Sequence, residues 1–291
     1  MRDKIPPKWT FDSQKPKRLS EDLFLAFAEL VYNQTGIRFH SDARFILERR
    51  LLQRMRALNI PDYERYYYHL QYHPDREVEL ERLIDIVTTH ETYFFRERRQ
   101  LDCFREEILP ILMADKKQDA LKTLRIWSAG CSTGEEPYTI AMILNEVPEL
   151  KDWNIFIFAS DISSWALKVA REGIYGRSSF RDMDEYYLKK YFKPVGGDRF
   201  KINDRIREKV MFGKVNILDT SRLVLYGLLD AIFCRNVLIY FDLPAKKKAV
   251  DNMYERLRSG GFLLLGHSES LLGIDARLKL VHFKHDLVYQ K

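Results

Sequence analysis

Apolar residues recur at helical spacing through the first third of the chain, and capping residues mark where each run begins. Four helices are predicted: from Ser20 to Gly36, from Ser41 or Asp42 to Leu58, from Pro61-Asp62 through Leu70, and from Pro74-Asp75 through Val87. Residues 20–90 are therefore predicted to form an all-α helical bundle. The preceding residues 1–19 are rich in proline and lysine and lack periodicity, so we expect a flexible tail there.

The second predicted helix has two faces of different character. Its apolar residues predict the face that packs in the bundle: Phe45, Leu47, Leu51, Leu52, Met55 and Leu58. Its other face carries Arg44, Arg49, Arg50, Arg54 and Arg56, opposed by Glu48. Two interpretations stay open. The arginines form a solvated charged face, or they form a docking surface for an acidic partner, whose association such charge would steer.

The pattern changes near residue 90. A polar and aromatic stretch, Thr88–Arg96, leads into a helical pattern from Arg96 to Met113, so residues 91–123 are predicted to be a linker and connecting helix. From 124 to 291, short apolar runs alternate with helical patterns, which predicts an α/β domain with a mainly parallel sheet. The predicted strands cover residues 124–127, 155–159, 210–215, 229–234 and, after a turn at Ser259-Gly260-Gly261, 262–266, with a final hairpin at 278–289. A Gly196-Gly197 turn predicts a small β insert at about residues 176–210.

The segment Leu124–Ala141 has the pattern of a strand, a glycine turn and a helix. Its spacing is not the dinucleotide G-x-G-x-x-G, and no lysine follows to make a phosphate-binding loop. Instead Glu135 and Glu136 stand at the start of the helix. Carboxylates repel a phosphate group but accept hydrogen bonds from an amine or from hydroxyls. This segment therefore favours a ligand such as S-adenosylmethionine, which carries an ammonium and a sulfonium.

Polar or small residues follow four of the predicted strands. They are Gly130–Gly134, Asp161, Asn216 and the pair Arg235-Asn236. Because ligands of open α/β sheets bind outside the carboxyl ends of the strands, we expect these residues to line one crevice. Asp161 has two open interpretations, a helix cap or an acceptor for ribose hydroxyls.

Composition limits the class of protein. The 291 residues are 46% apolar and 31% charged, as in an ordinary globular protein, and no apolar run is long enough to cross a membrane. There is no secretory signal pattern at the N-terminus, and the three cysteines form no zinc or disulfide pattern, so we expect a cytoplasmic protein. The net charge of +6 is spread along the chain and is not gathered in a nucleic-acid-binding arm.

Six blocks of the sequence together resemble a known family. They are Thr88–Arg96, Ser128–Met142, Ala159–Ser163, Gly213–Leu218, Asp230–Asp242 and Gly260–Leu271. In this order they resemble chemotaxis receptor methyltransferases of the CheR type, from about residue 20 to the C-terminus. The resemblance implies a Rossmann-like class I methyltransferase domain with a small inserted β subdomain, preceded by the all-α bundle. It also implies methylation of glutamate side chains on the cytoplasmic domain of bacterial chemoreceptors, with S-adenosylmethionine as donor and S-adenosylhomocysteine as product.

The resemblance assigns site residues by position. The cofactor contacts would be His90, Thr92, Arg96, Glu136, Asp161, Asn216, Ile217, Arg235 and Asn236. Glu136 is preferred to Glu135, and His90 stands where the family is expected to have Asn. Arg96 and Tyr240 are the candidate catalytic residues: Arg96 or Arg235 would hold the incoming carboxylate, and Tyr240 would line the pocket. Cys131 and Cys234 are interpreted as packing residues, and no metal is expected.

The chemistry suits these residues because a glutamate is already ionised at neutral pH and needs no general base. Alignment and removal of water remain for the protein to supply. The short β insert resembles members that do not bind a receptor tail peptide, so we expect direct docking through the helical bundle, by a monomer without nucleic acid or membrane insertion. Two alternatives stay open: a nucleic-acid methyltransferase, although its usual motifs are absent, and a module that binds the cofactor without turnover.

Overall fold

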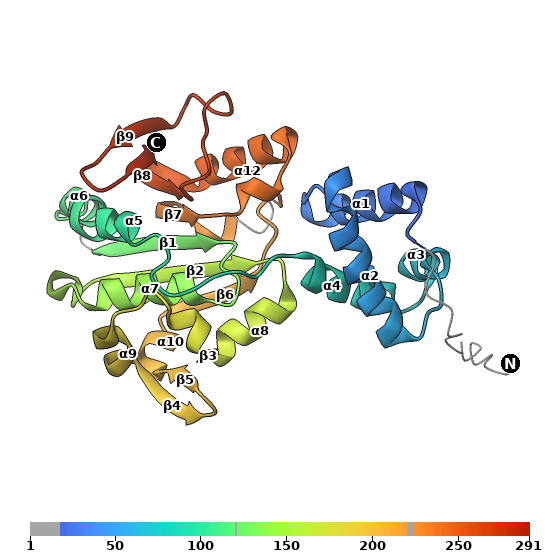
Figure 1. Cartoon of the computed structure of the whole chain (residues 1–291). Helices are drawn as coiled ribbons and strands as arrows, with labels where there is room; N and C mark the ends of the chain where they lie inside the picture. Colours follow the sequence, from blue (N-terminus) through green and yellow to red (C-terminus); the bar gives the residue numbers. More distant parts are fainter. Residues whose placement is uncertain (1–17, 120, 220–223) are drawn as a thin grey trace, which may run out of the picture. The chain divides into compact units, whose positions relative to one another are not determined.

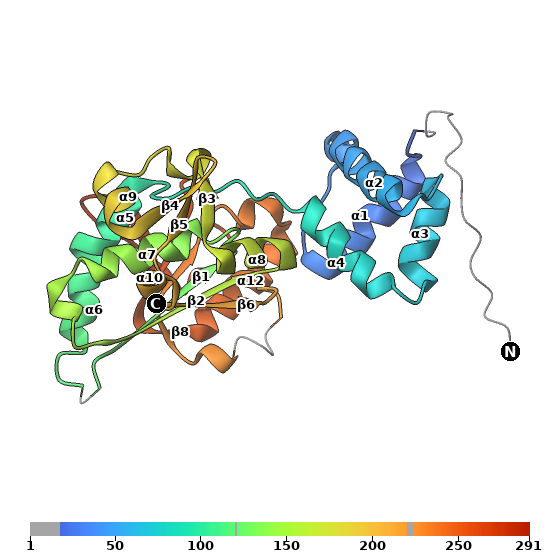
Figure 2. The ribbon, with the colours of Figure 1, turned by 90° about the horizontal axis from the view of Figure 1, so that it is seen from below.

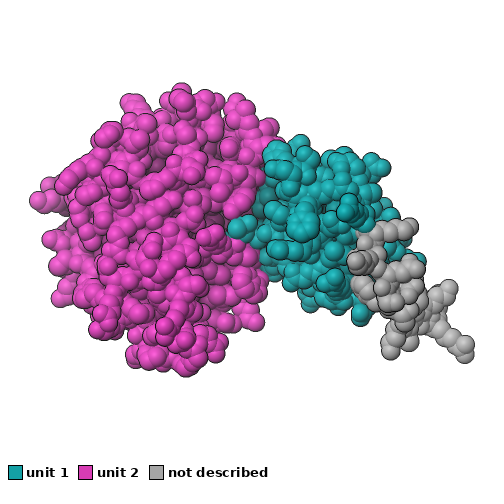
Figure 3. All heavy atoms as spheres, viewed as in Figure 1, with its two compact units in different colours: residues 1–89 teal, residues 90–291 magenta. Residues whose placement is uncertain are grey.

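The computed structural model describes residues 18–119, 121–219 and 224–291. All but the last two residues of the expected tail at 1–19 lie outside the described residues. The chain divides into two compact units between Thr89 and His90, drawn in teal and magenta in Figure 3. Each unit has its own hydrophobic core.

The described part of the first unit is all-α (Figure 1). Its elements are α1 (Glu21–Thr35), the 3-10 turn η1 (Ser41–Ala43), α2 (Arg44–Leu58), α3 (Tyr63–Tyr72) and α4 (Arg76–Val87). The hydroxyl of Ser20 accepts from the N–H of Leu23 and caps α1, and Gly36 ends this helix at a φ of 75°. The predicted caps therefore set the bounds of α1.

The prediction that Phe45 packs in the bundle is wrong. Leu47, Leu51 and Met55 are fully buried, whereas the side chain of Phe45 is 71% exposed. Each residue of a helix is turned by about 100° from the one before it, so Phe45 lies about 200° from Leu47 and faces solvent.

The arginines of α2 fall into two groups, those with partners inside the bundle and those exposed to solvent. Arg54 makes a two-pronged ion pair with Glu79 of α4, at 2.9 and 2.7 Å, and the hydroxyl of Tyr66 donates to the same carboxylate at 2.8 Å. Arg44 pairs with Glu21 and Arg50 donates to the carbonyl of Val87. These three arginines therefore stabilise the bundle, while Arg49 and Arg56 are exposed.

A seven-stranded sheet forms the centre of the second unit (Figures 1 and 2). Its strands are β1 (Thr123–Ala129), β2 (Asn154–Asp161), β6 (Val210–Lys214), β7 (Leu229–Cys234), β8 (Leu257–Leu265), β9 (Lys279–His282) and β10 (Leu287–Gln290). Their spatial order is β6-β2-β1-β7-β8-β10-β9. The first five are parallel, and the C-terminal hairpin β9–β10 adds antiparallel strands at one edge.

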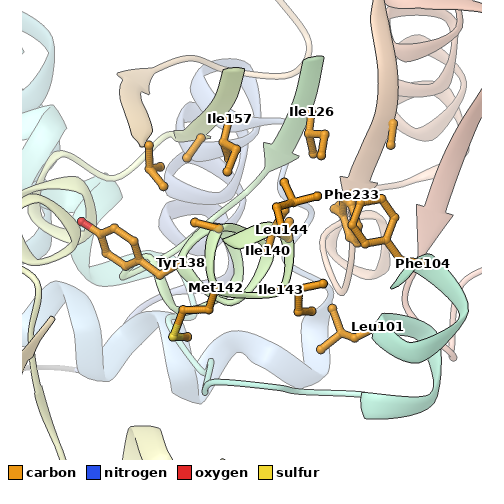
Figure 4. Close-up of a cluster of buried hydrophobic side chains, with 14 of the residues drawn as sticks. Leu101, Phe104, Ile126, Tyr138, Ile140, Met142, Ile143, Leu144, Ile157 and Phe233 are labelled. Atoms are coloured by element: carbon orange, nitrogen blue, oxygen red, sulfur yellow. The ribbon is translucent and has the colours of Figure 1, made fainter. Parts of the chain in front are cut away.

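Helical elements connect these strands. They are α5 (Arg98–Cys103), the π-helical η2 (Phe104–Ile108), α6 (Leu109–Asp115), α7 (Glu135–Asn145), η3 (Pro148–Leu150), α8 (Ser164–Glu172), η5 (Val224–Tyr226), η6 (Leu238–Tyr240) and α12 (Leu243–Arg256). Figure 4 shows side chains of α5, η2, α7, β1, β2 and β7 meeting in one cluster, with Ile126, Ile140 and Phe233 among them. No described helix combines the length and apolar character needed to cross a bilayer.

The insert between α8 and β6 is larger than the predicted hairpin. It holds β3 (Ile174–Gly176), η4 (Arg177–Phe180), α9 (Glu185–Tyr191), β4 (Phe192–Gly196), β5 (Arg199–Ile202) and α10 (Asp204–Arg207). Its three strands form a separate antiparallel sheet in the order β3-β5-β4, and Gly196-Gly197 make the predicted turn. The third strand was missed because β3 has only three residues.

The predicted turn at Ser259-Gly260-Gly261 is wrong, because β8 already begins at Leu257. Gly260 lies inside the strand at a φ of 74°, and the register of β8 against β7 shifts nearby. Both glycines are paired with the C-terminal residue: Gly260 N–H donates to the Lys291 carbonyl at 2.8 Å, and Lys291 N–H donates to that of Gly261 at 3.0 Å. The glycines therefore make a bulge, which is a second role for glycine in strands.

Candidate functional site

The strand order has a topological switch point between β1 and β7, where we expect the ligand crevice. From β1 the chain runs outward to β2 and β6, and it then returns to place β7 on the other side of β1. At such a switch point the loops after the two strands diverge, and open α/β sheets bind ligands there. The two loops in this chain are 130–134 after β1 and 235–240 after β7, and both contain predicted site residues.

The loop after β1 lies close to its neighbours. Gly130 has a φ of 79°, and a Cβ at this position would come within 2.5 Å of Val237 in the loop after β7. The N–H groups of Gly130 and Cys131 donate to the carbonyl of Ser160 at 2.8 and 2.9 Å. Only glycine fits this backbone and this contact, so the turn predicted from the sequence is formed as expected.

Asp161, at the end of β2, holds the same loop. Its carboxylate accepts from the N–H of Ser132 at 2.8 Å and from that of Ser163 at 2.9 Å. Burial raises the pKa of Asp161, although these N–H groups oppose the shift. The helix-cap role belongs to the Ser163 hydroxyl, which accepts from Ala166 N–H at 3.0 Å. The backbone N–H groups of Ser132, Ile162 and Ser163 take three of the roughly four acceptor positions of this carboxylate, so one is left for a ribose hydroxyl.

Arg235 is the central cation of the crevice. Its Nη1 donates to Oε2 of Glu136 and its Nη2 to Oε2 of Glu97, each at 3.1 Å, and Nη2 also donates to the carbonyl of Arg96. The Arg235 side chain is only 3% exposed. Burial raises the pKa of Glu97, but the charge of Arg235, the electrostatic effect of His267 and the hydrogen bonds from Arg235 and Asn236 together lower it below its usual value. Because its guanidinium already faces two carboxylates, Arg235 is poorly placed to hold a substrate carboxylate as well.

The two adjacent glutamates of α7 have different surroundings. Glu135 is 2% exposed and accepts from the hydroxyls of Thr133 at 2.6 Å and Ser179 at 3.0 Å, and burial raises its pKa. Glu136 is more exposed and accepts from the Ser128 hydroxyl at 2.7 Å as well as from Arg235. Glu135 therefore joins the loop to the insert, and Glu136 lies with the crevice network.

The segment from residue 90 to 97 forms another wall of the second unit. The His90 ring lies 5.1 Å from that of Trp165 on α8 and is close enough to Asp161 to act on it electrostatically. Arg96 donates to the carbonyl of Glu91 at 3.0 Å, and its guanidinium lies over the Tyr93 ring at 5.8 Å. Thr92 and Tyr240 are half-buried, with Tyr240 at the end of η6. Figure 1 shows this segment leading into α5.

Asn216 and Ile217 follow β6. The side chain of Asn216 accepts from the N–H of Leu218 at 2.9 Å, which tightens the turn. Ile217 is buried, and its carbonyl accepts from the Asn252 side chain of α12 at 2.7 Å. The backbone of this turn is thus held from two sides, next to β2 and its Asp161.

Two carboxylates of the site were missed from the sequence. Glu97 pairs with Arg235, and Glu269, four residues after the end of β8, accepts N–H bonds from the loop after β7. Glu97 follows a run of aromatic residues and has no spacing signal. Glu269 lies in the quoted block Gly260–Leu271, where a carboxylate just after a strand was a signal that was not used.

Two family models match the chain. The all-alpha domain of CheR methyltransferase matches residues 22–88, and the SAM-binding domain of CheR methyltransferase matches residues 90–287. The chain belongs to the CheR methyltransferase family. This confirms the resemblance and the predicted fold class, and it makes the second unit of the chain a methyltransferase domain whose cofactor is S-adenosylmethionine.

Curated relatives match over most of their length. Chemotaxis protein methyltransferase 2 of Vibrio cholerae is 37% identical over 92% of both chains. The chemotaxis protein methyltransferase of Borreliella burgdorferi is 34% identical, over 88% of this chain and 90% of its own. Among solved structures, the SAM-bound magnesium protoporphyrin IX methyltransferase of Synechocystis matches at 14% identity and a TM-score of 0.33, covering 66% of this chain and 77% of its own, which is too distant to carry an argument.

The site residues of the CheR domain fit this cofactor. Among the described side chains, Ser132 Oγ and Arg235 Nε are buried polar atoms without a hydrogen-bond partner. Ser132 lies in the loop after β1, and Arg235 lies in the loop after β7. Buried polar atoms are rarely left unpaired unless a ligand or water completes them. The carboxylates of Glu136 and Asp161 add acceptors, which match the ammonium and hydroxyl groups of S-adenosylmethionine.

Proposed function

We propose that this protein transfers the methyl group of S-adenosylmethionine to glutamate side chains on the cytoplasmic domain of chemoreceptors, giving glutamyl methyl esters. The observation that carries the proposal is the match to chemotaxis protein methyltransferases along nearly the whole of both chains, at 37% identity for one of them. The comparisons give no support to a nucleic-acid methyltransferase or to a binding module without turnover. The protein would act as a monomer in the cytoplasm.

The cofactor supplies an activated methyl group, and the chain supplies alignment. Glu136 and Asp161 offer acceptors to the amine and hydroxyl groups, and the turn at Asn216-Ile217 borders the same crevice. Arg235 pairs with Glu136 at 3.1 Å and orients its carboxylate. Because a glutamate substrate is a carboxylate at neutral pH, the chain needs no residue that removes a proton.

Arg96 and Tyr240 would act on the substrate. The Arg96 guanidinium is half-exposed, and the contacts that hold it are a carbonyl and a ring face, so it can still pair with an incoming carboxylate. Tyr240 is the last residue of η6 and lies four residues after Asn236. Its hydroxyl would line the pocket. Arg96 is therefore preferred over Arg235 for the substrate role, since Arg235 is buried between two acids.

The exposed face of α2 is the proposed docking surface for the receptor. Phe45, Arg49 and Arg56 share this face, and they make up what we call the α2 face. An exposed aromatic side chain flanked by arginines is a frequent composition at protein interfaces. Because Arg44, Arg50 and Arg54 already stabilise the bundle, the α2 face is what remains for a partner with acidic helices.

Charge reversal tests the docking surface. Arg49→Glu combined with Arg56→Glu is expected to slow receptor methylation at least about tenfold through a higher KM for receptor, with affinity for S-adenosylhomocysteine unchanged. Arg82→Glu, an exposed arginine on α4, is the matched control and is expected to have little effect. Equal effects of both changes, or micromolar binding of a receptor tail peptide to the insert, would contradict docking through the α2 face.

Mass spectrometry tests the proposed function. A receptor cytoplasmic fragment is incubated with the protein and S-adenosylmethionine and then fragmented to locate the added methyl mass. The proposal predicts the mass on glutamate side chains, and its loss when those glutamates are changed to alanine. Methylation of lysine, cysteine or a nucleic acid in place of glutamate would overturn the proposal.

A further inference from the structure

The side chain of Glu269 gathers backbone N–H groups from two segments. Its Oε2 accepts from Asn236 and from Gly266, each at 2.8 Å. Its Oε1 accepts from Val237 at 2.9 Å and from Ile239 at 3.2 Å. One carboxylate therefore serves four donors, three of which belong to the loop after β7.

The loop after β7 needs such an acceptor because its backbone is irregular. The strand ends at Cys234, and Asn236 then takes a left-handed φ of 58°, which is uncommon for a residue with a side chain. In this conformation the successive N–H groups turn toward one place and have no strand partner. A partly buried N–H without an acceptor is costly, so the carboxylate of Glu269 decides whether this loop keeps its shape.

Packing between the two segments leaves little freedom. A Cβ at Gly266 would lie 2.8 Å from Asn236 Nδ2 and 2.9 Å from Glu269 Oε2. On its other side the loop meets the turn after β1, where Val237 fills the space beside Gly130. Glu269 thus fixes the loop after β7, which itself lies against the turn after β1, from a position outside both loops.

We propose that Glu269 is a positioning residue for methyl transfer, whose carboxylate fixes the backbone from Asn236 to Ile239 so that Asn236 and Tyr240 face the crevice. This inference rests on the proposed function for the roles of these two residues. Glu269 itself contacts neither cofactor nor substrate in the proposal. Its effect is transmitted through four hydrogen bonds to the backbone.

The test compares two glutamates that do the same structural task at different places. Glu107, like Glu269, accepts two or more backbone N–H bonds in the second unit, from Lys284 at 2.8 Å and His285 at 3.1 Å. Glu269→Gln and Glu107→Gln are made in the full chain. S-adenosylhomocysteine binding is measured by calorimetry and amide hydrogen exchange by mass spectrometry, and receptor methylation gives kcat and KM.

Glu269→Gln is expected to raise the Kd for S-adenosylhomocysteine at least about tenfold, to speed exchange at residues 236–239 and to lower kcat. Glu269→Asp keeps the charge on a shorter arm and is expected to recover part of the affinity. Glu107→Gln is expected to leave the Kd unchanged. If Glu269→Gln fails to fold, Glu269→Asp decides: a raised Kd in a folded protein supports the proposal, and an unchanged Kd overturns it.

Wild-type affinity of Glu269→Gln, or equal weakening by Glu107→Gln, would also overturn the positioning role. The binding measurement needs no receptor. If the wild-type protein failed to methylate receptors, the proposed function would be contradicted. The effect of Glu269→Gln on the Kd for S-adenosylhomocysteine would still test the positioning role.

Discussion

The guanidinium of Arg235 lies 3.1 Å from the carboxylate of Glu136 and 3.1 Å from that of Glu97. These residues come from the end of β7, the start of α7 and the start of α5, three segments that are distant in sequence. A cation shared between two largely buried acids thus ties these three segments together.

Removing Arg235 leaves two buried carboxylates without their counter-charge. Arg235→Ala is expected to cost about 3–5 kcal/mol of unfolding free energy and to abolish measurable binding of S-adenosylhomocysteine. Arg177, whose side chain is 77% exposed in its ion pair with Asp198, is the control. Arg177→Ala is expected to cost less than about 1 kcal/mol in the same urea titrations. Similar losses of unfolding free energy in both variants would show that the ion pairs of Arg235 stabilise the protein no more than an exposed ion pair does.

Gly130 and Gly273 separate a steric clash from backbone strain. Both have a positive φ, of 79° and 72°, but a Cβ would meet Val237 at Gly130 and nothing within 4 Å at Gly273. Gly273→Ala is expected to cost about 1–2 kcal/mol from strain alone. Gly130→Ala is expected to cost more and to weaken S-adenosylhomocysteine binding at least about tenfold. Intact binding by Gly130→Ala would argue against a crevice at this turn.

Glu97 gives the stability of the second unit a defined pH dependence. Burial raises the pKa of Glu97, but Arg235, together with His267 and Asn236, lowers it below the usual value of about 4.5 in the folded protein. The stability it contributes is therefore present above about pH 4.5 and is lost as the pH falls through the lower, folded-state pKa. The difference in Tm between wild type and Glu97→Gln is expected to shrink between pH 6 and pH 3. A difference that stays constant or grows in acid would contradict the assigned ion pair.

The ion pair between Arg54 and Glu79 is predicted to stabilise the first unit alone. Arg54→Ala leaves Glu79, which is 3% exposed, without its partner, and about 3–5 kcal/mol is expected to be lost from the helical bundle. Circular dichroism would show the helical signal melting earlier, with S-adenosylhomocysteine binding by the second unit retained. Arg82→Ala, on the exposed side of α4, is the control and is expected to leave the melting curve unchanged.

Arg96 and Arg99 test the substrate role. Arg96→Ala is expected to lower kcat for receptor methylation about a hundredfold or more, because the carboxylate oxygen is no longer held in line with the methyl carbon and the sulfur. Arg99 is exposed and only three residues away, and Arg99→Ala is expected to keep wild-type kcat. Steady-state kinetics with a receptor fragment decides between them. Unchanged cofactor affinity and unchanged turnover in Arg96→Ala would remove this residue from the site.

The sequence predicted the elements whose signals are local. Ser20 and Gly36 set the ends of α1, and the glycine turn after β1 has the predicted backbone. The prediction for Phe45 was wrong because this apolar residue, two positions before Leu47, was assigned to the buried face of the helix. The prediction of a turn at Gly260 was wrong because glycine occurs in bulges as well as in turns. Only the pairing of Gly260 with Lys291 shows that this glycine lies in a bulge.

The site was predictable where strand ends and family blocks coincide, and less so elsewhere. Asp161 and Arg235 were found at the ends of their strands, because the topology of a parallel sheet gathers those ends on one side. Glu97 was missed because its partner Arg235 lies far away in the sequence and no local spacing records the contact, whereas Glu269 was missed because a carboxylate just after a strand was not used as a signal. The ion pair between Arg54 and Glu79 could likewise not be predicted, because it depends on how α2 and α4 pack.

The most direct test of the proposed function is the chemical stability of the product bond. The protein is incubated with methyl-labelled S-adenosylmethionine and a receptor cytoplasmic fragment, and the labelled fragment is treated with mild base. The account predicts that the label is released as methanol, because a glutamyl methyl ester is hydrolysed under these conditions. Label that withstands base, or no label on any of a panel of receptors from a protein that binds S-adenosylhomocysteine, would contradict it.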